Sequence, residues 1–113
     1  MVHCYCRSGE GALRARMFCP GDGEGEDAAT GSANGALMGL LASLDGFPKN
    51  GTVTLLVTQG CEMGRPSTIY VSADRKNGAT TAIHIGGAVT KTIMKGEIDL
   101  SDIYTSPKPL PRE

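Results

Sequence analysis

The sequence predicts an α+β domain in which a mostly antiparallel sheet is rolled around one central helix. Three observations predict it. Stretches in which apolar and polar residues alternate, as in strands, lie on both sides of one segment with helical periodicity. That helical segment carries a glycine at every fourth position, which favours close packing against other parts of the chain. The dipeptide Asn77-Gly78 is a strong signal for a tight hairpin between two of the later strands.

The sequence pattern of the N-terminal part predicts a β-hairpin followed by a loop. Val2 to Arg7 alternates and is predicted as a strand, and Ala12 to Cys19 is predicted as its antiparallel partner. The turn between them is Ser8-Gly9-Glu10-Gly11. The segment Pro20 to Gly25 is rich in glycine and is predicted as a loop.

The period then changes to that of a helix, predicted from about Gly31 to Leu44. Its apolar residues recur at three- and four-residue spacing: Ala33, Ala36, Leu37, Leu40, Leu41 and Leu44. Gly31, Gly35 and Gly39 form a bare stripe that weakens the helix intrinsically, so we expect it to be buried with backbone or sheet close against it. A membrane dimer motif is an alternative for such a stripe, but the segment is too short and too interrupted.

The rest of the chain returns to strands. The turn-rich segment Asp45 to Gly51 ends the helix. Four strands are then predicted, at Thr52–Gln59, Ser67–Asp74, Ala79–Ile85 and Ala88–Met94. We expect one domain over residues 1–100 and a proline-containing, frayed tail over residues 101–113.

Composition limits the classes of partner. The chain has 113 residues, enough for one domain with a workable core, and its net charge of −1 gives no long-range attraction to nucleic acid or to an anionic membrane. No apolar run approaches the length of a membrane span, and the N-terminal residues lack the form of a signal peptide. The expected location is therefore cytoplasmic.

The four cysteines, Cys4, Cys6, Cys19 and Cys61, form no CxxC pair. We interpret them as small apolar residues of a reduced protein. The alternative is a metal site built from His3, Cys4 and Cys6, but with only two histidines in the chain it is poorly supported.

The most informative segment is Glu26-Asp27-Ala28-Ala29-Thr30-Gly31-Ser32-Ala33-Asn34-Gly35, where a loop becomes the helix. The first turn of a helix has free N–H groups and the positive end of the helix dipole, so this segment could hold a carboxylate or a phosphate. The acids beside it could instead handle protons. The plainer alternative is an N-cap, in which Thr30 or Ser32 accepts hydrogen bonds from the next turn.

Four motifs occur in order along the chain. They are Arg16-Met17-Phe18-Cys19-Pro20-Gly21, the segment Glu26 to Gly35, Gln59-Gly60-Cys61-Glu62-Met63-Gly64-Arg65-Pro66-Ser67, and Gly86-Gly87-Ala88-Val89. Together they resemble the C-terminal half of the PhzF-like, phenazine-biosynthesis family, which has the diaminopimelate epimerase fold. The resemblance covers roughly residues 2 to 100. It implies one of two pseudosymmetric lobes, an active site in the cleft between them, and isomerisation by proton transfer next to a carboxylate with neither a metal nor an organic cofactor.

The resemblance also implies roles for single residues. Asp27 is expected to contact substrate or to take part in the proton shuttle. Ser32 and the N–H groups around Gly31, with Thr30 and Ala33 beside them, are expected to bind the substrate carboxylate. Thr30 stands where the epimerase and proline racemase branches have a catalytic cysteine, and because a hydroxyl is far less acidic than a thiol, two-thiol racemisation is not expected.

The half of the family that supplies a glutamate base and a histidine-bearing loop is absent from this sequence. Proton transfer needs its acid and base on either side of the substrate. The first hypothesis is therefore an isomerase lobe whose cleft is completed by a complementary lobe or by a second copy of the chain, and the expected ligand is a small carboxylate. The alternatives are a non-catalytic module that binds small anions, and a fragment of a longer isomerase.

Two further polar residues are candidates for a role. Arg65 could pair with Glu26 or Asp27, could meet an anionic ligand, or could be solvated in its turn. His84 lies between Ile83 and Ile85 and faces the other way, and we expect a surface histidine rather than a catalytic one.

Overall fold

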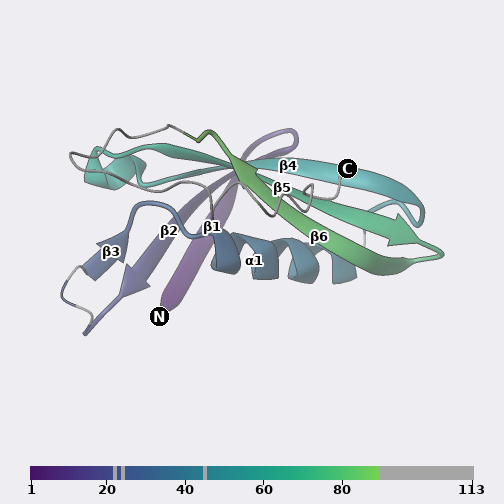
Figure 1. The fold of residues 1–113 in the computed structure, drawn as a ribbon, viewed down its shortest axis with the longest axis horizontal. Coiled ribbons are helices and arrows are strands. Elements are labelled where there is room, and N and C mark those ends of the chain that lie inside the picture. The colour runs from purple at the N-terminus through teal and green to yellow at the C-terminus, as the bar shows by residue number, and fades with distance from the viewer. Residues whose placement is uncertain (22, 24, 45, 90–113) are drawn as a thin grey trace, which may run out of the picture.

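The computed structural model describes residues 1–21, 23, 25–44 and 46–89. In this part of the chain, six strands form one sheet, and the helix α1 lies along one of its faces (Figure 1). The elements in chain order are β1 (Val2–Gly9), β2 (Ala12–Cys19), β3 (Gly25–Asp27), α1 (Gly31–Ser43), β4 (Gly51–Gln59), the short 3₁₀ helix η1 (Cys61–Met63), β5 (Ser67–Lys76) and β6 (Ala79–Gly87). The predicted α+β fold with a mostly antiparallel sheet and one helix is confirmed.

Most predicted elements are present, and one prediction is wrong. Within the stretch expected to be irregular up to the helix, Gly25–Asp27 forms the strand β3. The predicted strand Ala88–Met94 is not formed at Ala88 and Val89, and the rest of it lies outside the described residues, as does the expected tail at 101–113. The turn η1 was not predicted, because three residues are too few to show a helical period.

The strand order β1-β2-β4-β5-β6 follows from the hairpins and from one crossover. The pairs β1–β2, β4–β5 and β5–β6 are antiparallel. Tight turns join β1 to β2 and β5 to β6, whereas the connection from β4 to β5 contains η1. The pair β2–β4 is parallel, and the connection between these two strands contains α1. This crossover places the helix against the sheet.

The core lies between α1 and the face of the sheet that α1 covers. It consists of apolar residues from β2, α1, β4 and β5, namely Leu13, Ala15, Leu37, Met38, Ala42, Val57, Ile69, Val71 and Ala73. Alternation along each strand sends these side chains to one face. Burial of this apolar surface is the main stabilising contribution to the fold.

The glycine stripe of α1 packs against β6, as the sequence indicated. A Cβ at Gly35 would lie 2.7 Å from Cδ1 of Ile85, and one at Gly39 would lie 3.1 Å from Cδ1 of Ile83. The bare stripe therefore lets the helix approach the isoleucines of the sheet.

The expectation that α1 is buried holds for one side only. Leu40 and Leu44 are 52% and 53% exposed, on the side of α1 turned away from the core. The described strands cover the helix on the glycine side and at its buried residues, and they leave this second side uncovered. In the described part of the chain, no helix is long and apolar enough to cross a membrane.

Candidate functional site

The site is formed where two strands meet end to end along one edge of β2. The strand β4 runs parallel to β2 and ends with Gln59 opposite Ala15. The strand β3 runs antiparallel to β2 and ends with Asp27 opposite Met17. Because these two positions of β2 are only two residues apart and face the same way, Gln59 and Asp27 lie close together on the helix side of the sheet.

Gln59 is fully buried at this junction and uses its whole hydrogen-bonding capacity. Its Nε2 group donates to the carbonyl oxygen of Asp27 and to the hydroxyl oxygen of Thr30, each over 3.0 Å. Its Oε1 accepts from Nδ2 of Asn34 over 2.9 Å and from the backbone N–H of Thr30 over 3.3 Å. The side chain therefore joins the end of β4 to the loop that follows β3 and to the first turn of α1.

Thr30 donates its hydroxyl hydrogen to Oδ2 of Asp27 over 2.6 Å. Both side chains are half-buried. Thr30 is the residue before the helix, with extended backbone angles, and its carbonyl oxygen accepts from both the backbone N–H and the Nδ2 of Asn34. The turn from Asp27 to Asn34 is thus held by side chains at both ends.

Thr30 is the N-cap residue of α1, but the alternative in which the side chain of Thr30 or Ser32 accepts a cap hydrogen bond is wrong. No side chain of the described residues forms a cap hydrogen bond at the start of α1, because the Thr30 hydroxyl is directed to Asp27. The first-turn N–H groups of Gly31, Ser32 and Ala33 have no intrahelical acceptor in any α-helix. Ser32 is exposed, and Gly31 and Ala33 are partly exposed. A carboxylate and a set of helix-start amides therefore share one accessible segment.

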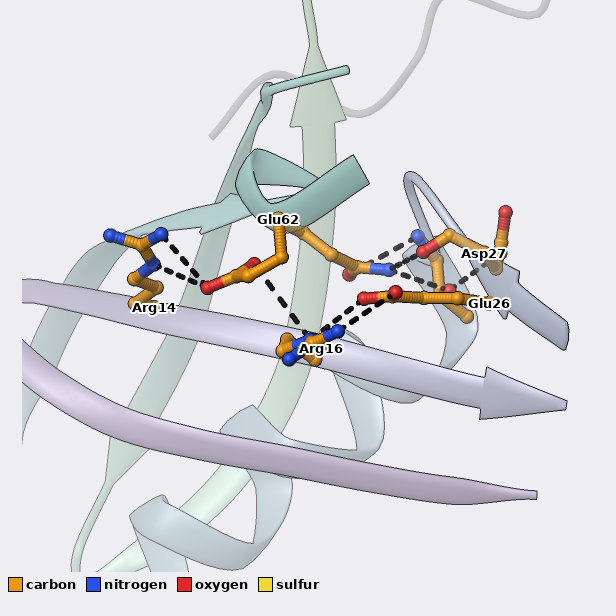
Figure 2. A network of polar contacts seen from close by, with 7 residues as sticks. Arg14, Arg16, Glu26, Asp27 and Glu62 are labelled. Carbon is orange, nitrogen blue, oxygen red and sulfur yellow. Dashed lines mark hydrogen bonds and ion pairs between the residues drawn. The ribbon is translucent and has the colours of Figure 1, made fainter. Parts of the chain in front are cut away.

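A row of alternating charges supports the other face of the junction (Figure 2). Arg16 donates two hydrogen bonds to the carboxylate of Glu26, over 2.8 and 3.0 Å. Glu62, from η1, lies between Arg14 and Arg16, 2.8 Å from the nearest nitrogen of Arg14 and 3.8 Å from that of Arg16. Through these two arginines, strand β2 is tied both to β3 and to η1.

These contacts set the ionisation of the charged groups. Hydrogen bonds from Arg16 hold the pKa of Glu26 below its usual value, and the same contact raises the pKa of Arg16. The pKa of Glu62 is lowered first by a hydrogen bond with its own backbone and then by Arg14. These contacts therefore favour the charged forms of Arg16, Glu26 and Glu62.

Comparison with known proteins identifies the family of this chain. The model of the phenazine biosynthesis-like protein family, PhzC-PhzF, matches residues 1–96 of the chain. The chain belongs to the phenazine biosynthesis-like family. This match covers the whole junction of β2, β3, β4 and α1.

Curated relatives within the family are isomerases. The chain is 39% identical over 92 residues to an uncharacterized isomerase of Mesorhizobium japonicum, covering 79% of this chain and 30% of the relative. It is 40% identical over 86 residues to the trans-2,3-dihydro-3-hydroxyanthranilate isomerase of Pseudomonas aeruginosa, covering 76% of this chain and 30% of that enzyme. An uncharacterized isomerase of Deinococcus radiodurans is 38% identical over 87 residues, which are 76% of this chain and 28% of the relative. The chain thus spans less than a third of the length of these relatives.

The two further polar residues lie outside this junction of the phenazine biosynthesis-like chain. Glu26 pairs with Arg16, and the exposed side chain of Arg65 forms no hydrogen bond or ion pair with Glu26 or Asp27 in the described structure. His84 is half-buried and sits 3.0 Å from Oδ2 of Asp74, on the face of the sheet opposite to the helix. Neither residue joins the segment from Asp27 to Ala33.

The cysteines form no metal site in the described part of the chain, where no three His, Cys, Asp or Glu side chains gather. All four are free thiols, and Cys4 and Cys6 are exposed on β1. None of the four cysteines is therefore buried in the core, as small apolar residues often are. His3 is partly buried instead, and its Nε2 has no partner among the described residues.

Sequence reasoning missed two residues that build the site, Gln59 and Asn34. Both are fully buried polar residues that bind each other across 25 positions of sequence. A signal was present, since each lies inside a motif of the phenazine biosynthesis-like resemblance. Gly60 carries a similar signal, because its φ of 84° suits glycine and a Cβ there would lie 2.8 Å from the carbonyl oxygen of Ala28.

Proposed function

We propose that this chain is the C-terminal lobe of a phenazine biosynthesis-like isomerase, and that the segment from Asp27 to Ala33 forms one wall of its active site. The observation that supports this most strongly is the pairing of an Asp27 carboxylate with an uncapped helix start in one accessible loop. The isomerase relatives and the family match support the reaction class.

The substrate in this proposal is a small carboxylic acid. Its carboxylate is bound by the hydroxyl of Ser32 and by the first-turn N–H groups of Gly31, Ser32 and Ala33. An anion is stabilised there by hydrogen bonds and by the helix dipole together. The name of the Pseudomonas aeruginosa relative, trans-2,3-dihydro-3-hydroxyanthranilate isomerase, gives the kind of acid that we expect: a cyclic amino acid with its carboxylate on the ring.

Asp27 handles the proton in this proposal. The reaction moves a proton from one carbon near the carboxylate to another, so one group must accept a proton and one must return it. Asp27 lies close to the helix start that holds the substrate, and its Oδ2 is engaged by Thr30. In this proposal Thr30 positions Asp27 through their hydrogen bond and lies beside the bound substrate. Thr30 does not act as a nucleophile.

The opposite wall of the cleft comes from outside the segment described here. Proton transfer across a substrate requires groups on both of its sides. The chain matches about 30% of the relatives' length, so a complementary lobe or a second copy of the chain supplies the second wall. The exposed apolar side of α1, with Leu40 and Leu44, is surface that such a partner would cover.

The test is solvent-deuterium incorporation into a ring amino acid of the anthranilate type, monitored by proton NMR. The chain is assayed alone and together with the separately produced part of the Pseudomonas aeruginosa relative that the chain does not match. We expect incorporation only in the mixture, and its loss when Asp27→Asn replaces the wild-type chain. Incorporation that is unchanged by Asp27→Asn would contradict the assignment. Tight carboxylate binding with no incorporation in the mixture would favour the non-catalytic anion-binding module instead.

A further inference from the structure

The orientation of the Gln59 side-chain amide is fixed by its neighbours. The carbonyl oxygen of Asp27 can only accept, and the N–H groups of Thr30 and Asn34 can only donate. Reversing the amide would place Oε1 against that carbonyl and Nε2 against two donors. The Nε2 group therefore faces Asp27 and the hydroxyl of Thr30, as the four contacts show.

This orientation also fixes the direction of the next hydrogen bond. One Nε2 hydrogen of Gln59 is donated to Oγ1 of Thr30, so the hydroxyl acts as an acceptor on that side. Its single hydrogen is then donated to Oδ2 of Asp27, 2.6 Å away. A chain of donors runs from Gln59 through Thr30 to Asp27. A proton could sit on Oδ2 only if the Thr30 hydroxyl turned its hydrogen away from this carboxylate.

The packing around the junction leaves this series of hydrogen bonds little freedom to rearrange. Gln59 is fully buried, and Gly60 after it approaches the carbonyl oxygen of Ala28 so closely that a Cβ would lie 2.8 Å from it. Among the described contacts, Oδ2 of Asp27 receives the Thr30 hydroxyl, and no side chain donates to Oδ1. The two oxygens of Asp27 are therefore not equivalent.

We propose that Gln59 is a positioning residue for proton transfer: it turns the Thr30 hydroxyl onto Oδ2 of Asp27, so that Oδ1 is the oxygen that exchanges a proton with the substrate. The inference rests on the proposed function for the role of Asp27. The hydrogen-bond direction itself depends only on Gln59 and on its partners Asp27, Thr30 and Asn34. Gln59 does not touch the substrate and acts through Thr30.

The experiment is solution NMR of the full chain, which observes the direction directly. A scalar coupling across the hydrogen bond is measured between the hydroxyl hydrogen of Thr30 and the side-chain carboxyl carbon of Asp27. We compare the wild-type chain with Gln59→Glu, which keeps the shape but replaces the donor by an acceptor. We expect the coupling in the wild type and its loss in Gln59→Glu, with hydroxyl exchange about fivefold to tenfold faster, as for the loss of one hydrogen bond. Absence of the coupling in the wild type, or its persistence in Gln59→Glu, would overturn the proposal.

A second, nearly isosteric variant covers the case in which Gln59→Glu does not fold. Thr30→Val removes the hydroxyl, and Thr30→Ser is the matched control that keeps it. We expect one of the two Gln59 side-chain N–H hydrogens to exchange about fivefold faster in Thr30→Val and to remain slow in Thr30→Ser. Equal exchange in both variants would overturn the inference. These NMR measurements are made without substrate. A failure of the chain to bind a carboxylate would therefore refute the proposed function but would leave the outcome of this test unchanged.

Discussion

Gln59 donates its side-chain N–H to the backbone carbonyl of Asp27 over 3.0 Å, and this bond joins the ends of β4 and β3 beside β2. The two residues are 32 positions apart in the sequence. Their proximity follows from the register of β2, which places Gln59 opposite Ala15 and Asp27 opposite Met17. The candidate site is therefore an outcome of sheet topology, and its loop is held by a buried amide.

Replacing this amide should destabilise the chain. In Gln59→Met, a side chain of similar size leaves Nδ2 of Asn34 and the N–H of Thr30 without the acceptor that they now share. We expect a loss of about 2–4 kcal/mol in the free energy of unfolding, because buried polar groups lose their partners. Urea denaturation followed by circular dichroism measures it. Thr58→Val, at the neighbouring position of β4, is the control and should change the midpoint much less; an equal loss in both variants would contradict the account.

The packing of α1 on β6 predicts coupling between Gly35 and Ile85. A Cβ at position 35 would lie 2.7 Å from Cδ1 of Ile85, and Ile85→Val removes that atom. We expect Gly35→Ala to be less favourable in the wild-type background than in Ile85→Val, by about 0.5–1 kcal/mol. A double-mutant cycle of unfolding free energies gives the coupling. Ile83→Val with Gly35→Ala is the matched comparison, and purely additive effects at 35 and 85 would refute the close contact.

The pair of Arg16 and Glu26 predicts a dependence of stability on acid. Hydrogen bonds from Arg16 place the pKa of Glu26 below its ordinary value of 4.5 in the folded chain. The resulting stabilisation is present above the unfolded-state pKa and is lost as the pH falls through the lower folded-state pKa. We expect the urea midpoint of the wild type to fall more steeply below pH 4.5 than that of Arg16→Gln. Arg75→Gln, in a distant hairpin, is the control and should behave like the wild type. If the wild type and Arg16→Gln lose stability equally in acid, the pair of Arg16 and Glu26 does not contribute this stabilisation.

His3 predicts a second pH effect, in a different range. Burial lowers the pKa of His3 from 6.5 in the folded chain, and its Nε2 has no partner among the described residues. The unfolded chain therefore takes up a proton first, so stability declines as the pH falls below 6.5. His3→Gln should remove this decline in urea midpoints measured between pH 7 and 5, whereas Cys4→Ser should retain it. A decline of the same size in His3→Gln would assign the effect to another group.

Much of the fold could be predicted from local pattern. The alternation in residues 2–7 and 12–19, and the helical spacing after Gly31, identify elements whose apolar faces are distinct. The glycine stripe predicted close packing of the helix, and the contact of Gly35 with Ile85 explains it. The strand β3 escaped prediction because three residues with two acids carry no alternation, and pairing with β2 alone makes them a strand.

The site was predicted in part, for a comparable reason. The segment from Asp27 to Ala33 was identified through its motif, and its residues do lie together at the start of α1. Its buried partner Gln59 was not identified, because Gln59 reaches the segment only through the meeting of β3 and β4 along β2. The side-chain cap that was the plainer alternative for Thr30 or Ser32 is not formed, and the Thr30 hydroxyl is directed to the carboxylate of Asp27 instead.

The most direct test of the central claim is an amide NMR titration of the chain with anthranilate. We predict saturable shifts of the backbone N–H signals of Gly31, Ser32 and Ala33, and about tenfold weaker binding in Ser32→Ala, since a hydrogen bond to a charged group is lost. Asp27→Asn should bind at least as well as the wild type, because it removes a negative charge near the bound carboxylate. Shifts located elsewhere on the chain, or binding that Ser32→Ala leaves unchanged, would contradict the assignment of this helix start as the carboxylate site.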